Sequence, residues 1–81
     1  MDLNSVKPAK TVDARSMACP GPLLEAKKGI AAVKVGEILE IQSGDKGSRE
    51  DIPAWCAKTG NEYLGHLEKD GYDSLYVLRK K

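Results

Sequence analysis

Apolar residues recur at helical spacing in residues 20–33. Leu23, Ala26, Ile30 and Val33 fall at positions i, i+3, i+7 and i+10, so they share one stripe of a helix surface. The lysines of this segment lie off the stripe, where they face solvent. The pattern predicts a helix that packs one face on a core.

Shorter segments alternate apolar and polar residues, as half-buried strands do. They are residues 11–15, 37–42, 62–69 and 72–79. Leu39 and Ile41 are expected to face the core in the second strand, as are Leu75 and Val77 in the fourth. Asp70-Gly71 is a hairpin turn signal between the last two strands. The sequence therefore predicts four strands, the last two paired by a tight turn.

A second helix is expected before residue 60, and its start is ambiguous. Ser48 and Asp51 have the spacing of a capping box, but a start at Ser48 puts Pro53 in the second turn, where a hydrogen bond is lost. We favour a continuous, distorted helix over a later start. Gly60 ends it. The residues expected on its apolar face are Ile52, Trp55, Cys56 and Thr59.

The resulting order, β-α-β-α-β-β, predicts an α/β two-layer sandwich. A chain this short favours a four-stranded mixed sheet with both helices on one face. A helical crossover makes the first two strands parallel, so the loops after them lie at the same sheet edge. Those loops carry Cys19 and residues 43–48. Sites gather at that edge in open α/β sheets.

Composition limits the classes of function. Eighty-one residues predict one domain at 10–81, preceded by a flexible arm at 1–9. Thirteen basic and twelve acidic residues give a net charge of +1, which does not favour nucleic acid or membrane as a partner. The basic end, Arg79-Lys80-Lys81, is expected to be solvated. No signal peptide or membrane span is visible, so we expect a cytoplasmic monomer with free thiols.

Cys19 stands where a strand gives way to a helix. Pro20 suits the first helical position, which makes Cys19 the predicted N-cap. The positive end of the helix dipole favours a thiolate and lowers the pKa of such a thiol. Pro20 and Pro22 lack N–H groups, so Gly21 is the only backbone donor in that turn. The alternative is an ordinary exposed cysteine before a proline-started helix.

The other candidate ligands favour structural roles. Cys56, beside Trp55 on an apolar face, is expected to be a buried, inert thiol rather than a second reactive one, and we do not expect a disulfide with Cys19. His66 is expected at the surface, with a Cys/His pair as the alternative. Two cysteines and one histidine lack the paired spacing of a zinc site, so no metal is predicted.

Charged residues near the predicted edge are candidates for supporting roles. Asp13 and Arg15 flank the approach to Cys19, and Arg15 is expected either to stabilise the thiolate, to contact a partner or to pair with Asp13. A docking rim around Cys19 is the second candidate, with solvated charges as the alternative. Its residues are Lys27, Lys28, Asp45, Lys46 and Arg49.

These motifs resemble the TusA/SirA family of small sulfur carrier proteins. The resemblance rests on Val12-Asp13-Ala14-Arg15, Cys19-Pro20-Gly21-Pro22-Leu23-Leu24 with Ala26-Lys27-Lys28, Gly36-Glu37, Asp51-Ile52-Pro53-Ala54-Trp55-Cys56 and Thr59-Gly60. It covers about residues 10–80 and implies the same two-layer fold. Ser16 departs from the glycine of many relatives, which alters the turn only slightly.

The resemblance implies that Cys19 carries sulfur as a persulfide. The implied donors are a cysteine desulfurase or a rhodanese-like enzyme, and the implied acceptors are DsrE-type or related proteins. Destinations in the family are tRNA thiolation, molybdenum cofactor and sulfur oxidation. The resemblance implies a carrier rather than an enzyme, with no cofactor. The competing hypothesis is a thiol-based redox or regulatory module in which Cys19 is oxidised.

Overall fold

The computed structural model describes residues 7–16 and 21–80 of the chain. Its elements are β1 (Lys10–Ala14), α1 (Gly21–Ala32), β2 (Ile38–Ser43), α2 (Ser48–Thr59), β3 (Glu62–Lys69) and β4 (Tyr72–Leu78). The predicted order is confirmed, and the strand boundaries lie within one residue of those predicted. None of the helices in the described residues is long and apolar enough to cross a membrane.

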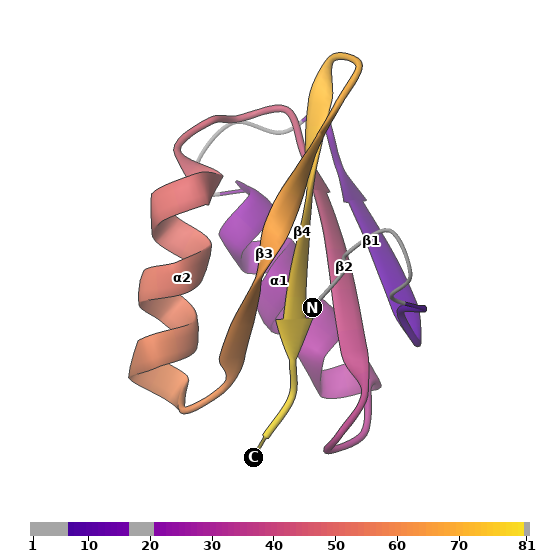
Figure 1. The fold of residues 1–81 in the computed structure, drawn as a ribbon, viewed down its shortest axis with the longest axis vertical. Helices are drawn as coiled ribbons and strands as arrows, with labels where there is room; N and C mark the ends of the chain where they lie inside the picture. Colours follow the sequence, from indigo (N-terminus) through magenta and orange to yellow (C-terminus); the bar gives the residue numbers. More distant parts are fainter. Residues whose placement is uncertain (1–6, 17–20, 81) are drawn as a thin grey trace.

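The four strands form one mixed sheet in the order β1-β2-β4-β3. β1 pairs with β2 in parallel, and β4 pairs antiparallel with both β2 and β3. Both helices lie on the same side of the sheet, α1 against β1 and β2 and α2 against β3 and β4 (Figure 1). The predicted two-layer sandwich is therefore confirmed.

The core fills the space between the helices and the sheet. Leu39, Ile41, Leu75 and Val77 are fully buried on the helix-facing side of the two central strands, as the alternation predicts. Val12 of β1 and Val33, the residue after α1, also belong to the core, and the helices contribute Ala26, Ile52, Trp55 and Cys56.

The buried face of α1 differs from the predicted stripe. Ala26 and Val33 are buried as expected, but Leu23 and Ile30 are only partly buried. Gly29 is also buried, and a Cβ added there would lie 2.8 Å from Val12 Cγ1 and 2.9 Å from Leu39 Cδ1. The helix packs close to the sheet because this position has no side chain.

The second helix is continuous through Pro53, as favoured from the sequence, but its start is not a capping box. Gly47 is the N-cap and supplies no side-chain hydrogen bond. The Ser48 side chain points inward and is buried. Thr59 is exposed, contrary to expectation, and its hydroxyl donates to the carbonyl of Trp55 at 2.9 Å. Gly60 ends the helix with a φ of 82°, as predicted.

Of the basic residues expected to be solvated at the C-terminal end, Arg79 is partly buried, Lys80 is exposed, and Lys81 lies outside the described residues. Arg79 Nη1 donates to the carbonyls of Ile30 and Val33, at the C-terminal end of α1. Lys80 Nζ lies 3.1 Å from a carboxylate oxygen of Glu62. A cation at a helix C-terminus satisfies its last carbonyls and complements its dipole. Arg79 therefore fastens the end of β4 to α1.

Candidate functional site

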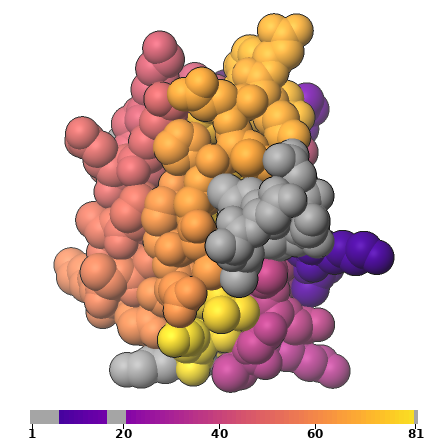
Figure 2. Space-filling view, viewed as in Figure 1, coloured from indigo at the N-terminus to yellow at the C-terminus, as the bar shows by residue number. Residues whose placement is uncertain are grey.

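Three chain connections meet at one end of the sheet. Ala14 pairs with Ser43, so β1 and β2 end side by side. An added Cβ at Gly44, the next residue, would lie 2.6 Å from the carbonyl oxygen of Arg15 and 3.9 Å from that of Gly71. The end of β1, the β2–α2 loop and the β3–β4 turn therefore pack together, at the upper end in Figure 1. Figure 2 shows the β3–β4 turn projecting at this end.

Cys19 and Pro20 lie outside the described residues, in the segment that joins β1 to α1. The residues on either side are placed. Ser16 is exposed after the end of β1, and Gly21 is the first residue of α1. Pro22, expected to support the site, is buried. The N-cap role predicted for Cys19 remains a prediction.

Asp13 and Arg15 form a local ion pair with two parallel hydrogen bonds. Arg15 Nε lies 2.9 Å from Asp13 Oδ1 and Nη2 lies 3.0 Å from Oδ2, while the backbone N–H of Arg15 also donates to Oδ1 at 3.1 Å. These bonds lower the pKa of the Asp13 carboxyl to about 2. The guanidinium carbon of Arg15 lies 5.3 Å from the ring centroid of Tyr72 in β4. The pair is thus charged near neutral pH and connected to the β3–β4 turn.

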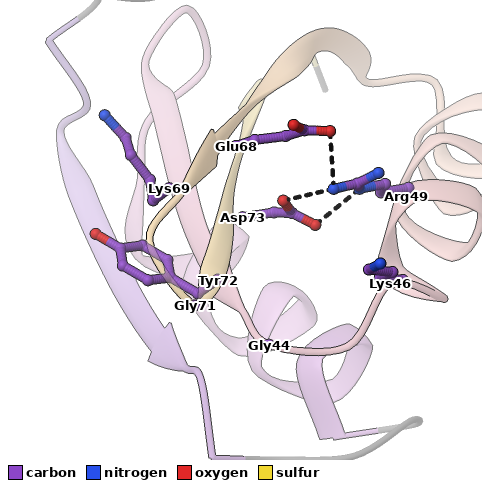
Figure 3. A pocket seen from close by; sticks show the side chains of 8 residues that line it. All are labelled: Gly44, Lys46, Arg49, Glu68, Lys69, Gly71, Tyr72 and Asp73. Carbon is purple, nitrogen blue, oxygen red and sulfur yellow. Dashed lines mark hydrogen bonds and ion pairs between the residues drawn. The ribbon is translucent and has the colours of Figure 1, made fainter.

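Arg49 connects the first turn of α2 to the β3–β4 hairpin. Its Nε and Nη2 donate to the two carboxylate oxygens of Asp73 at 2.8 and 2.9 Å, and Nη2 also lies 3.1 Å from Glu68 (Figure 3). Asp73 is only 6% exposed, so its charge depends on this partner. Arg49, expected in a docking rim, forms ion pairs with two carboxylates of its own chain, Asp73 and Glu68. Its role toward a partner remains a prediction.

A serine pair fixes the loop between β2 and α2. The hydroxyls of Ser43 and Ser48 are buried and lie 2.8 Å apart. The N–H of Asp45 donates to Ser43 Oγ at 3.1 Å, and Asp45 Oδ1 accepts the N–H of Gly47 at 2.9 Å. These bonds satisfy polar groups that burial would otherwise leave unpaired. Asp45, predicted as part of the docking rim, therefore makes hydrogen bonds within the β2–α2 loop.

The candidate lysines lie in two places. Lys46 lines a recess of about 390 Å³ that Arg49 and Asp73 also line. Lys27 lines a separate groove of about 260 Å³, together with Leu23 of α1 and with Trp55 and other residues of α2. Lys28 is exposed on α1 and lies 3.5 Å from Glu25. The structure thus brings Asp13, Arg15, Asp45, Lys46 and Arg49 to one end, with Lys27 and Lys28 along α1.

The described cysteine is unsuited to nucleophilic chemistry. Cys56 is 1% exposed, and burial raises the pKa of its thiol to about 11. It carries no disulfide. The burial expected from the sequence is confirmed, and the structural role of this thiol remains a prediction. His66 is partly buried in β3, at the opposite edge of the sheet from β1, and its Nδ1 lies 3.3 Å from the hydroxyl of Tyr63.

Sequence reasoning missed Tyr72, Asp73 and Glu68 at this end of the sheet. Asp70-Gly71 marks the turn that brings them there, but no local pattern connects Asp73 to an arginine 24 residues earlier. Within residues 7–16 and 21–80, no group of three His, Cys, Asp or Glu side chains is placed to hold a metal ion.

Replacing Asp73 with asparagine is expected to lower the melting temperature at neutral pH. The Arg49 guanidinium holds the pKa of the Asp73 carboxyl below its ordinary value in the folded chain. The carboxylate therefore contributes stability above the unfolded pKa of about 3.9, and this contribution disappears as pH falls through the lower folded value. Melting curves from pH 7 to pH 2 are expected to show a constant difference between wild type and Asp73→Asn that shrinks below about pH 4.

The matched control for this prediction is Asp70→Asn, which removes an exposed carboxylate from the same hairpin. It is expected to change the melting temperature little at any pH. A difference between wild type and Asp73→Asn that stayed unchanged down to pH 2 would show that the Arg49–Asp73 charge pair does not stabilise the fold.

Comparisons with known proteins agree with this architecture. The family model described as "Sulfurtransferase TusA" matches residues 10–79. Among solved structures, a SirA-like protein from Desulfitobacterium hafniense superposes with a TM-score of 0.76 at 26% identity, covering 89% of this chain and 99% of that one.

Several relatives are named as sulfur carriers. YrkF of Bacillus subtilis, named as a candidate sulfur carrier, is 44% identical over 75 residues, which are 93% of this chain; the match spans only 40% of YrkF. The sulfur carrier protein TusA of Allochromatium vinosum is 38% identical over 86% of this chain and 90% of its own length. TusA of Pseudomonas entomophila is 37% identical over 88% of each chain. With the family model matching nearly the whole chain and the fold agreeing, this protein belongs to the TusA family.

Proposed function

We propose that this protein carries sulfur between proteins as a persulfide on Cys19. Relatives across 86–93% of the chain are named as sulfur carriers, which supports the role. The observation that carries the choice of residue is the burial of Cys56. The chain has two cysteines, and one of them is buried with its thiol pKa raised to about 11. Cys19 is the remaining thiol.

Loading of Cys19 is a thiol exchange. The Cys19 thiolate attacks the outer sulfur of a persulfide on the donor, a new S–S bond forms, and the bond between the two donor sulfurs breaks. The donor cysteine leaves as a thiolate and takes up the proton released from the transferred sulfur. The number of S–S bonds is unchanged, so this step requires no oxidant or reductant.

Delivery repeats the exchange in the other direction. A thiolate on the acceptor attacks the outer sulfur of the Cys19 persulfide, and Cys19 leaves as a thiolate. A low thiol pKa serves both steps, because it supplies the nucleophile for loading and a good leaving group for delivery. We propose a cysteine desulfurase or rhodanese-like donor and a DsrE-type or related acceptor, in the cytoplasm.

The end of the sheet supports this role through its surroundings. Residues on both sides of Cys19 are held in place, Arg15 by its ion pair with Asp13 and Pro22 by burial. Among the described residues, the adjacent surface carries two open recesses of about 390 and 450 Å³, which a partner protein could contact. Lys46 borders one of these recesses as a candidate partner contact.

A relay assay tests the proposal. Radiolabelled cysteine, a cysteine desulfurase and this protein are incubated, and the purified protein is then mixed with an acceptor thiol protein. We expect label to enter this protein and to leave it for the acceptor, with dithiothreitol releasing it at either stage. Gain of oxygen or a disulfide with no gain of sulfur would support the redox module instead. If a desulfurase and a thiosulfate-charged rhodanese both failed to load the protein, the carrier role would be wrong.

A further inference from the structure

The tip of the β3–β4 hairpin, residues 69–72, is held by two arginines from other elements. Arg49, in the first turn of α2, donates to both carboxylate oxygens of Asp73, at the base of the tip. The guanidinium carbon of Arg15, which follows β1, lies 5.3 Å from the ring centroid of Tyr72. Two-point carboxylate bonds and cation–π contacts each restrict the groups that form them. The hairpin tip is therefore held in place where it projects from the molecule (Figure 2).

Two recesses adjoin at this hairpin tip. The recess of about 390 Å³ and that of about 450 Å³ both include Gly71 and Tyr72 in their linings. Figure 3 shows the first recess from close by, between the hairpin and the start of α2. The second recess is lined in addition by Ser16, after the end of β1. A protein surface that receives the hairpin tip therefore contacts both recesses at once.

The linings of the two recesses carry opposite net charge. The first has three cations against two carboxylates, and the second has two carboxylates against one cation. The charged residues of the first are Lys46, Arg49, Lys69, Glu68 and Asp73, and those of the second are Asp13, Arg15 and Asp70. Both arginines are paired with carboxylates of their own recess. Among the described residues, Lys46, Lys69 and Asp70 form no ion pair, so they supply the excess charge.

We propose that the hairpin tip is a docking element for a protein partner in sulfur transfer, and that this partner places an acidic side chain against the first recess and a basic side chain against the second. The inference rests on the proposed carrier function, which requires contact with other proteins. Complementary charges steer the association of two proteins and set their relative orientation. Because the hairpin tip is already held, docking does not incur the free-energy cost of ordering it.

The opposite charges of the recesses distinguish this docking mode from general electrostatic attraction. A uniformly acidic partner would bind Lys46→Glu/Lys69→Glu more weakly and Asp70→Lys more tightly, because the two variants change the net charge of the chain in opposite directions. The proposed mode predicts weaker binding by both variants, because each of them reverses the excess charge of one recess.

The test measures the binding of these variants to three fluorescently labelled probes: a cysteine desulfurase, a thiosulfate-charged rhodanese and a DsrE-type protein. The matched controls reverse exposed charges at the opposite end of the sheet. Lys10→Glu/Lys34→Glu is the control for the lysine pair, and Glu62→Lys is the control for Asp70→Lys. A lysine fits at residue 70, because positive φ angles occur only at glycines among the described residues. Melting curves establish that every variant is folded.

We expect both hairpin variants to raise the dissociation constant of a probe that binds wild type about tenfold at low salt, and the controls to change it less than twofold. The difference is expected to shrink at high salt, because exposed charges are screened. Unchanged binding of both hairpin variants to every probe, tighter binding of Asp70→Lys, or no binding of wild type to any probe would overturn the inference.

Sulfur transfer is measured separately in the relay assay, so the two proposals fail in different ways. Sulfur relay by wild type with unchanged binding of the hairpin variants would leave the carrier function and overturn the docking element. Weaker binding of both hairpin variants with no sulfur loaded on wild type would leave the docking element and overturn the carrier function.

Discussion

Cys19→Ser is expected to abolish sulfur relay, whereas Cys56→Ser is expected to retain it. A serine hydroxyl cannot hold a persulfide, and it is not ionised at neutral pH. Cys56 is buried, and burial raises the pKa of its thiol to about 11, so its removal takes away a packing atom rather than a nucleophile. The measurement is the rate of label transfer from donor to acceptor with each variant.

The two cysteine variants control for one another. Cys56→Ser places a hydroxyl at a core position and is expected to lower the melting temperature, since a buried hydroxyl needs a hydrogen-bond partner. Its relay rate, measured below the melting transition, is expected to stay within twofold of wild type. Loss of relay in folded Cys56→Ser together with retention in Cys19→Ser would reverse the assignment of the carrier residue.

Gly29→Val is expected to destabilise the fold by about 1–3 kcal/mol, the range for overpacking a core. The added side chain begins from a Cβ that already lies 2.8 and 2.9 Å from atoms of Val12 and Leu39. Valine regains a few tenths of a kcal/mol of helix propensity over glycine, roughly 0.3–0.5, which does not offset the clash. For a domain of this length, total stability is on the order of 4–12 kcal/mol, so the effect is large.

The comparison for Gly29→Val is Ala31→Val, which introduces the same side chain at an exposed position of α1. This control is expected to cost only about 0.5 kcal/mol, through helix propensity. Denaturant unfolding measures both variants. Equal stabilities would mean that α1 does not rest on the sheet at Gly29, contrary to the packing described.

Hydrophobic periodicity predicted the architecture of this chain because the helical spacing in residues 20–33 and the alternation in the strands are both regular. Leu39 and Ile41 alternate with polar residues in β2, and Asp70-Gly71 leaves little choice for the final turn. The order of elements then restricts the topology, since a helical crossover makes β1 and β2 parallel. The shared end of the sheet follows from topology alone, before any motif is considered.

Contacts between residues far apart in the chain could not be predicted from the sequence. By sequence alone Gly29 is a weak helix former, and only the approach of Val12 and Leu39 shows that this position has no room for a side chain. Arg49 and Arg79 read as solvated charges, because nothing local shows that Asp73 or the end of α1 lies within reach. Ser48 reads as a cap because its hydrogen bond to Ser43 depends on how the loop closes.

In the candidate site, too, local features were predicted from the sequence and long-range contacts were not. The prediction of an N-cap thiol at Cys19 follows from local sequence, since a cysteine before Pro-Gly-Pro and a helical pattern favours one, whereas its persulfide role is what the family resemblance implies. The pairing of Asp13 with Arg15 was one of the alternatives weighed and is confirmed. The part played by Tyr72 was not predicted, because it enters through the register of β4 and the turn before it.

The most direct test of the account is to locate the sulfur after loading. The protein is incubated with a cysteine desulfurase and cysteine, digested without reductant, and its peptides are mapped by mass spectrometry. We predict one additional sulfur atom on the peptide that contains Cys19 and none on the peptide that contains Cys56. Sulfur on Cys56, or oxygen on Cys19 with no sulfur on either peptide, would contradict the claim that Cys19 carries sulfur.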